Sequence, residues 1–202
     1  MTILVIETAT AACSVALLDG DHVLAARHEL VGRGHAERLV PMIGDVLAEA
    51  GMTRADLIQV DCGPGSFTGI RVGLAAARAL SLAWGVPVAG FSALALIAAT
   101  AEEDVGVAIS GGHGELFVQR FAHAPLAPVD DLLSLPPEQA AIAIPDDRVL
   151  GSGAAALVAA RGTGSAEEVF PNARDALLLP AALTALPPTP LYGRAPDARL
   201  PQ

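Results

Sequence analysis

A glycine-rich loop carries the strongest chemical signal in this chain of 202 residues. Residues 63–69 read Gly-Pro-Gly-Ser-Phe-Thr-Gly and follow an apolar run at 57–62 that is typical of a strand. A strand, a glycine turn and a helix in this order present backbone N–H groups and the positive end of the helix to an anion. The candidate loop residues are Gly63, Pro64, Gly65, Ser66 and Thr68, of which Ser66 or Thr68 would cap the helix. The glycines alone favour a tight connection without a ligand, because the string is neither G-x-G-x-x-G nor a Walker A motif.

The helix predicted at 68–84 has small residues at every fourth position, namely Gly69, Gly73 and Ala77. Such a stripe lets another helix approach closely, and it suits packing against the protein's own sheet equally well, so both interpretations stay open. An apolar helix predicted at 35–50 precedes it, which suggests that one face of the pair packs on the sheet and the other on a partner. The residues expected to line or support that interface are Leu39, Met42, Ile43, Val46, Gly69, Arg71, Gly73 and Ala77. We expect Gly73→Leu to leave the fold largely intact and to block docking.

Side chains suited to catalysis or metal binding are few. Ser66 does not lie in a G-x-S-x-G nucleophile elbow. No two histidines are four residues apart, and Cys13 and Cys62 are distant in sequence, so a metal site lacks its ligands. Both cysteines lie in apolar runs and are predicted to be buried free thiols. The sequence therefore predicts no catalytic residue, no metal and no cofactor.

Three ionisable residues of the first lobe, Glu7, His35 and Glu37, could belong to a site. Glu7 closes the first predicted strand among apolar residues, as either an edge charge or the remnant of an acidic site. His35 and Glu37 are expected in the solvated first turn of a helix, where a carboxylate is favourable near the positive helix end. The sequence alone does not separate the two interpretations of Glu7.

The composition excludes several classes of protein. There are 22 acidic and 12 basic residues, the net charge is −10, and every basic residue is arginine. Without lysine there is no Walker A lysine and no Schiff-base lysine, and an acidic chain is a poor nucleic-acid binder by itself. The mean hydropathy of +0.50 comes from 41 alanines and from no apolar run long enough to cross a membrane. With no positively charged leader, we expect a soluble cytoplasmic protein without membrane contact.

Hydrophobic periodicity predicts an α/β protein of two lobes, 1–104 and 105–202. In the first lobe the expected strands are 3–6, 15–18, 23–30, 57–62 and 86–91, and the expected helices are 35–50, 68–84 and 92–103. The helix at 35–50 is expected to bend near Pro41. In the second lobe we expect strands at 105–110 and 115–121, loops over 122–150, helices at 154–161 and 174–186, and an irregular tail from 187.

Several of these segments together resemble the TsaB family, also called YeaZ. The segments are Ile-Glu-Thr-Ala-Thr at 6–10, Cys-Ser-Val-Ala-Leu at 13–17, Gly-His-Ala-Glu-Arg-Leu-Val-Pro-Met at 34–42, Gly-Pro-Gly-Ser-Phe-Thr-Gly-Ile-Arg-Val-Gly at 63–73 and Pro-Leu-Tyr-Gly-Arg at 190–194. The string at 63–73 is specific and the others support it. The resemblance is dense over residues 1–97 and loose beyond them.

The resemblance implies a fold and a set of partners. It implies an actin/Hsp70-like (ASKHA) fold of two lobes, the second one reduced. It also implies a non-catalytic scaffold or activator of a TsaD-like transferase, which makes threonylcarbamoyladenosine next to the tRNA anticodon. A TsaE-like ATPase joins that complex, tRNA is contacted only through it, and the protein forms a homodimer when alone. The helices that pack against the partner would be those at 35–50 and 68–84.

Three departures from the fold's nucleotide-binding relatives suggest a degenerate site. Glu7 takes the place of the family's aspartate, Ser-Gly-Gly at 110–112 replaces Asp-x-Arg, and Ala93 and Ile97 fall where TsaD has a metal-binding histidine pair. The residues of the possible vestigial nucleotide site are Glu7, Thr8, Thr10, Gly151 and Gly153. The alternatives are an autonomous ATPase or kinase of this fold, and a peptidase, for which no catalytic constellation is present.

Overall fold

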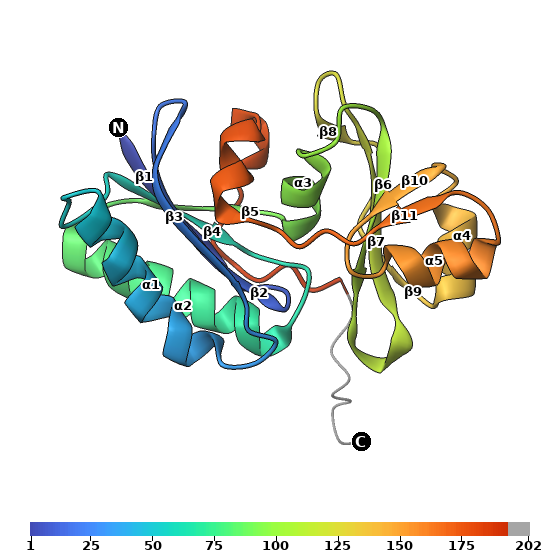
Figure 1. Ribbon diagram of the computed structural model, residues 1–202, viewed down its shortest axis with the longest axis horizontal. Coiled ribbons are helices and arrows are strands. Elements are labelled where there is room, and N and C mark those ends of the chain that lie inside the picture. The colour runs from blue at the N-terminus through green and yellow to red at the C-terminus, as the bar shows by residue number, and fades with distance from the viewer. Residues whose placement is uncertain (194–202) are drawn as a thin grey trace, which may run out of the picture.

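The computed structural model describes residues 1–193 and consists of two β-sheets with helices packed on them (Figure 1). The first sheet has the strand order β3-β2-β1-β4-β5. Its strands are β1 (Thr2–Glu7), β2 (Ala12–Asp19), β3 (His22–Leu30), β4 (Leu57–Asp61) and β5 (Val88–Phe91). The first three strands pair antiparallel, whereas β4 and β5 run parallel to β1 because helices connect them.

Two long helices, α1 (His35–Glu49) and α2 (Phe67–Trp84), lie side by side under one face of this sheet (Figure 1). The apolar stripe of α1 faces inward, as its periodicity predicts. Pro41 sits on the exposed side, and the helix continues through it. The short helix α3 (Ala93–Ala98) lies between the two sheets, fully buried.

The second sheet has the order β11-β10-β6-β7-β8, with β9 also paired to β7. Its strands are β6 (Val105–Ser110), β7 (Leu116–Ala122), β8 (Ala127–Pro128), β9 (Leu133–Leu135), β10 (Arg148–Leu150) and β11 (Ser165–Glu167). The helices of this part are α4 (Pro137–Ala143), α5 (Ala154–Arg161) and the 3₁₀ turn η1 (Gly112–Gly114). Figure 1 shows α4 and α5 on the outer side of this sheet, away from the first lobe.

Three predictions for the chain beyond residue 91 are wrong. The stretch 122–150, expected to be rich in loops and without a named element, contains β8, β9, α4 and β10, which are too short to give a periodic signal. The helix expected at 174–186 is two 3₁₀ helices, η2 (Ala173–Leu178) and η3 (Ala181–Leu183), because Pro180 separates them. The helix expected at 92–103 ends at Ala98.

The C-terminal segment returns to the first sheet after the second sheet is complete. Ser14 on β2 accepts a 2.9 Å hydrogen bond from the Ala173 backbone N–H, and η2 packs on β1, β2 and β3. Leu186 bridges to Gly90 at the free edge of β5. The strands up to β5 thus form the first sheet and those from β6 on form the second, while the C-terminal segment packs on the first. Of the helices in residues 1–193, none is both long and apolar enough to cross a bilayer.

Candidate functional site

The glycine loop packs directly against the turn between β1 and β2. The backbone N–H of Ser66 donates a 2.6 Å hydrogen bond to the Ala9 carbonyl oxygen. A β-carbon on Gly65 would overlap that same carbonyl, and one on Gly69 would overlap the carbonyl of Thr8. Gly63 has a φ of +98°, a conformation that favours glycine. Glycines are therefore required here so that two backbones can meet at close range.

Ser66 caps the N-terminal end of α2. Its side-chain oxygen accepts a 3.2 Å hydrogen bond from the Gly69 N–H, which confirms one of the two predicted capping positions. Thr68 is exposed in the first turn and has no such role. Gly85 ends α2 in the left-handed conformation with a φ of +68°, as predicted for the helix stop.

The predicted interface residues occupy the protein's own core, with one exception. Seven of them belong to α1 and α2 and are buried: Leu39, Met42, Ile43, Val46, Gly69, Gly73 and Ala77. A β-carbon on Gly73 would overlap the hydroxyl oxygen of Thr8 and touch Ile6 and Val60, so the small-residue stripe faces the sheet. The expectation that Gly73→Leu leaves the fold intact is therefore wrong. These seven residues support the helix pair, and any surface that a partner touches must come from their exposed neighbours.

Arg71 is the predicted interface residue that is exposed, and it belongs to an aromatic cluster. Its guanidinium carbon lies 3.5 Å from the centre of the Phe67 ring, and its Nη2 donates a 3.2 Å hydrogen bond to the Tyr192 hydroxyl. The rings of Phe67 and Tyr192 are 6.0 Å apart. Tyr192 belongs to the resembling segment at 190–194, of which Arg194 lies outside the described residues. The cluster joins the N-terminal end of α2 to the C-terminal segment.

A buried pair of carboxyl groups lies behind the glycine loop. Glu7 and Asp61 are the last residues of β1 and β4, which pair in parallel, and both are fully buried. Glu7 Oε2 and Asp61 Oδ2 have no hydrogen-bond partner in the described structure. Glu7 is thus no edge charge. Asp61 was missed in the sequence, although a signal was available, because both acids end strands that a parallel crossover would make neighbours.

Burial dominates the electrostatics of this pair. Loss of hydration raises the pKa of Glu7 well above its usual value, and the negative charge of Asp61 adds to that effect. Burial likewise raises the pKa of Asp61 to about 8.

The thiols of Cys13 and Cys62, both free and buried as predicted, have pKa values raised to about 12, again by burial.

A cleft of about 640 Å³ opens between the two sheets next to the glycine loop. Thr10, Gly65 and Ser66 line it from the first lobe, and residues 110–112 and Ser152 from the second. Glu168 is the one charged side chain among its lining residues in the described chain. No basic side chain in this lining would balance a phosphate.

Only part of the predicted vestigial nucleotide site reaches this cleft. Thr10 lines it, whereas Glu7 and Thr8 are buried behind the loop. Gly151 and Gly153 are buried, and their N–H groups already donate to the carbonyls of Glu167 and Ala108. They have no free N–H for a phosphate.

Other candidate ligands do not assemble either. Ala93 and Ile97 are buried on α3, where neither side chain can bind a metal. His35 is buried rather than solvated, with its Nε2 3.0 Å from the Ala12 carbonyl oxygen, while Glu37 is exposed as predicted. Within residues 1–193, no three His, Cys, Asp or Glu side chains gather as a metal site would require.

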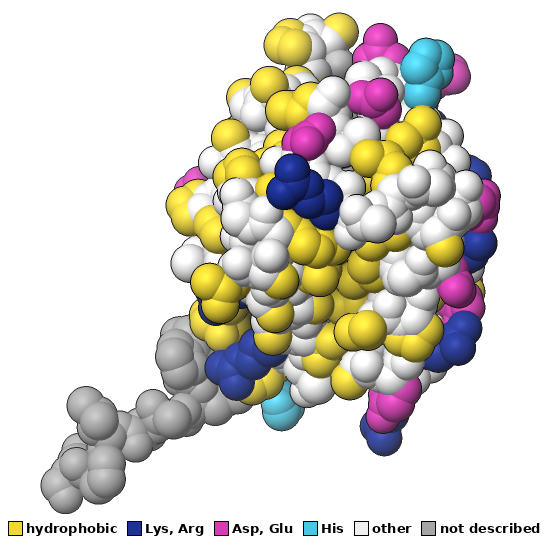
Figure 2. Space-filling model, turned by 90° about the vertical axis from the view of Figure 1, so that its left-hand side faces the viewer, with side chains coloured by type: hydrophobic (Ala, Val, Ile, Leu, Met, Phe, Trp, Pro, Cys, Tyr) yellow, Lys and Arg dark blue, Asp and Glu magenta, His cyan; other side chains and the backbone are white. Residues whose placement is uncertain are grey.

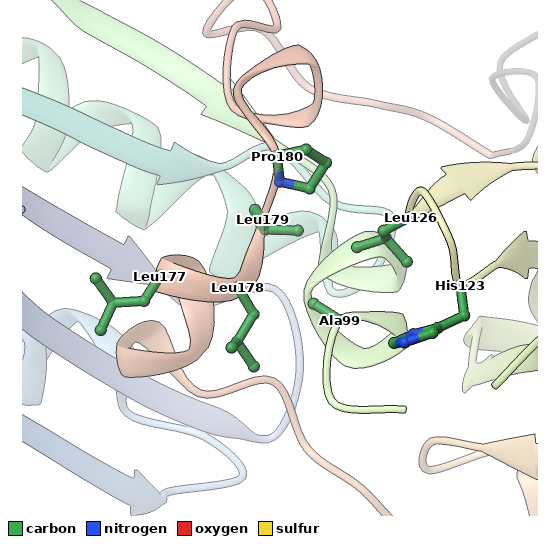
Figure 3. A pocket seen from close by; sticks show the side chains of 7 residues that line it. All are labelled: Ala99, His123, Leu126, Leu177, Leu178, Leu179 and Pro180. Atoms are coloured by element: carbon green, nitrogen blue, oxygen red, sulfur yellow. The ribbon is translucent and has the colours of Figure 1, made fainter. Parts of the chain in front are cut away.

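A second hollow, of about 450 Å³, lies where η2 approaches α3 and the turn before β8 (Figure 3). Its lining is Ala99, His123, Leu126, Leu177, Leu178, Leu179 and Pro180. The lining is apolar except for His123. Sequence reasoning named none of these residues as a site.

Comparison with known protein families and sequences points to one family. The model of the TsaD family, tRNA N6-adenosine threonylcarbamoyltransferase, matches residues 26–125. An uncharacterized protein of Mycobacterium tuberculosis (strain ATCC 25618 / H37Rv) is 34% identical over 210 aligned positions, which cover 98% of this chain and 94% of that protein. The tRNA threonylcarbamoyladenosine biosynthesis protein TsaB of Escherichia coli (strain K12) is 43% identical over 100 residues, 48% of this chain and 43% of TsaB.

Solved structures agree with this result over most of the chain. YeaZ from Pseudomonas aeruginosa is 31% identical, with a TM-score of 0.81 and coverage of 95% of this chain and 99% of YeaZ. The ethanolamine utilization protein EutJ from Carboxydothermus hydrogenoformans has a TM-score of 0.51 at 12% identity over 88% of both chains. At that identity the likeness shows the fold alone, and it confirms the predicted α/β, actin/Hsp70-like (ASKHA) fold.

Proposed function

The chain belongs to the TsaB/YeaZ family, and on that premise we propose that it takes part in tRNA threonylcarbamoyladenosine biosynthesis as a non-catalytic partner of a TsaD-like transferase. In this role it binds the transferase through the outer face of α1 and α2 and supports its activity. A TsaE-like ATPase joins the complex. Because the substrate of the pathway is tRNA, the proposal places the protein in the cytoplasm.

The observation that carries the proposal is the exposure of large apolar side chains on α1 and α2. Val40 on α1 is 66% exposed, and Phe67 and Leu82 on α2 are 55% and 87% exposed. Figure 2 views the side of the molecule on which these helices lie in Figure 1, and hydrophobic and uncharged atoms occupy much of its middle, with charged side chains mostly toward its margins. Apolar surface gathered in this way is typical of a protein interface.

Small residues make the same face suitable for another helix. Ala75, Ala79 and Ala83 recur at every fourth position of α2 and are exposed, two residues after the Gly69-Gly73-Ala77 positions that face the sheet. Gly44 and Ala48 are exposed on the neighbouring α1. At these small residues a partner helix can approach α1 and α2 closely.

Charged residues at the rim of this face would set the orientation of the partner. Glu37 and Asp45 are exposed on α1, and Arg71 and Arg78 are exposed on α2. Arg71 is held by Phe67 and Tyr192, and Arg78 donates a 2.7 Å hydrogen bond to the Pro188 carbonyl. Because both arginines are already positioned by the protein, less side-chain entropy is lost when they pair with acidic groups of a partner.

Two features support a non-catalytic role. The cleft between the sheets has Glu168 as its one charged lining residue in the described chain, which leaves phosphate charge unbalanced there. The acids Glu7 and Asp61 are fully buried and do not line that cleft. With a net charge of −10 and no lysine, the protein contacts tRNA only through the assembled complex.

In the absence of the transferase, the same apolar face leads to a homodimer. Two copies of α1 and α2 can bury Val40 and Leu82 against each other, since a two-fold interface uses one patch twice. The transferase and the second copy then compete for one surface.

The test is association with the TsaD-like protein of the same organism. Size-exclusion chromatography with light scattering, with and without ATP, measures the masses of the single proteins and of the mixture. We expect a homodimer alone and a heteromeric complex in the mixture. If the two proteins elute independently at micromolar concentration under both conditions, the proposed function is wrong.

A further inference from the structure

The buried carboxyl pair has a geometry that requires a proton. One oxygen of each group accepts a backbone hydrogen bond: Glu7 Oε1 from the Ala9 N–H at 2.7 Å, and Asp61 Oδ1 from the Gly63 N–H at 2.6 Å. The two groups end neighbouring parallel strands, one residue beyond the paired Ile6 and Val60, and two ionised carboxylates could only accept hydrogen bonds. The other two oxygens, Glu7 Oε2 and Asp61 Oδ2, are buried with no hydrogen-bond partner in the described structure, and a proton on one of them would supply the missing donor.

We propose that Glu7 and Asp61 hold a shared proton at neutral pH, and that this proton fastens the glycine loop to the first strand. Through Ala9 the pair fixes the turn between β1 and β2, and through Gly63 it fixes the loop that begins α2. These are the two backbone segments that meet at Ser66 and Ala9. The proton therefore lies at the joint that positions α2 on the sheet.

The groups around the pair supply no compensating positive charge. The ionisable neighbours on the adjoining strand and loop are the thiols of Cys13 and Cys62, which are uncharged because burial raises their pKa values to about 12. On η2, Arg174 and Asp175 interact with each other and with His28. On α2, Arg71 and Arg78 are exposed and bonded to Tyr192 and Pro188. β5, which pairs with β4, has no ionisable side chain.

Because of this buried pair, the stability of the folded protein should fall as the pH rises. In the unfolded chain both groups ionise near their ordinary pKa values of about 4, whereas in the folded protein burial raises the pKa of Asp61 to about 8 and that of Glu7 well above its usual value. Between about pH 4 and about pH 8 the folded state thus binds more protons than the unfolded state. The stabilisation that comes from protonating Glu7 and Asp61 is fully present below about pH 4. It is lost as the pH rises through their pKa values in the folded protein.

The direct test is carboxyl carbon-13 NMR of the full chain across a pH titration. We expect two side-chain carboxyl carbons, assigned to Glu7 and Asp61 by their loss in Glu7→Gln and Asp61→Asn, to remain unshifted through the range near pH 4. At least one should titrate near pH 8 or above. If both carbons titrate near pH 4, the shared proton does not exist.

A thermal measurement tests the same proton independently. The wild-type Tm should fall more steeply between about pH 5 and about pH 8 than that of Glu7→Gln, by roughly 3–5 °C per pH unit for each proton involved. The amide of Gln can still donate to Asp61 but does not titrate. Glu138→Gln, at an exposed glutamate on α4, is the matched control and should keep the wild-type slope. Equal slopes in wild type and Glu7→Gln would overturn the proposal.

Discussion

The hydroxyl oxygen of Thr8 occupies the space that a β-carbon on Gly73 would need. The same hydroxyl donates a 2.8 Å hydrogen bond to the Gly69 carbonyl, so it cannot turn aside without breaking that bond. One threonine thus fixes the spacing between the end of β1 and the first two turns of α2. The glycines of α2 serve the packing of the protein's own lobe.

Gly73→Ala should destabilise the protein by about 1–3 kcal/mol, because the added methyl group overlaps Thr8 in a closely packed core. Gly44→Ala is the matched control. Gly44 is exposed in the interior of α1 with no atom within 4 Å of an added β-carbon, so this change should stabilise by about 0.5–1 kcal/mol. Urea unfolding of both variants measures the two free energies. Equal effects of the two substitutions would contradict this account of α2 packing.

Ser66→Ala should cost about 0.5–2 kcal/mol of stability, because the Gly69 N–H loses its capping oxygen. Thr68→Ala, two residues on and exposed, should change the free energy of unfolding by less than about 0.5 kcal/mol. Thermal denaturation of the pair separates the two positions. A larger loss at Thr68 than at Ser66 would show that the cap is assigned to the wrong residue.

Ala79→Arg should weaken association with the TsaD-like transferase at least tenfold, about 1.4 kcal/mol, because a long charged side chain would stand in a helix–helix contact built from small residues. Ala159→Arg places the same side chain on an exposed position of α5 in the other lobe. Isothermal titration calorimetry should give a wild-type Kd for that control. Undiminished binding by Ala79→Arg would remove α2 from the interface.

The isolated protein should hydrolyse ATP no faster than buffer. The cleft lining in the described chain has no basic side chain, and the N–H groups of Gly151 and Gly153 are already engaged. A phosphate-release assay over a range of protein concentrations measures this. Turnover that rises with protein concentration and is absent in Glu7→Gln would favour the alternative of an autonomous ATPase.

The order of elements in the first lobe could be predicted because its signals are local. Apolar runs mark the strands, Ser66 starts α2 and Gly85 ends it. In the second lobe the predicted strands at 105–110 and 115–121 and the predicted helix at 154–161 correspond to β6, β7 and α5. The strands β8 and β10 could not be predicted, since they have two and three residues. Their pairing depends on contacts that lie far apart in sequence.

The candidate site, too, could be predicted from the sequence only in part. The glycine loop was visible in the sequence, but Asp61 was not, because it becomes a neighbour of Glu7 only through the parallel pairing of Ile6 with Val60. Which surface the stripe of Gly69, Gly73 and Ala77 meets also depended on a distant residue, Thr8. Periodicity locates a stripe and does not say which surface it meets.

The most direct test of the central claim is reconstitution of tRNA modification from purified proteins. Threonylcarbamoyladenosine is measured by mass spectrometry after incubation of tRNA and its precursor substrates with the TsaD-like transferase and the TsaE-like ATPase, with or without this chain. The account predicts that product forms only when the chain is added, that Ala79→Arg lowers the yield, and that Glu168→Ala in the cleft does not. Full product formation without the chain, or loss of product in Glu168→Ala with the complex still intact, would contradict a non-catalytic partner role.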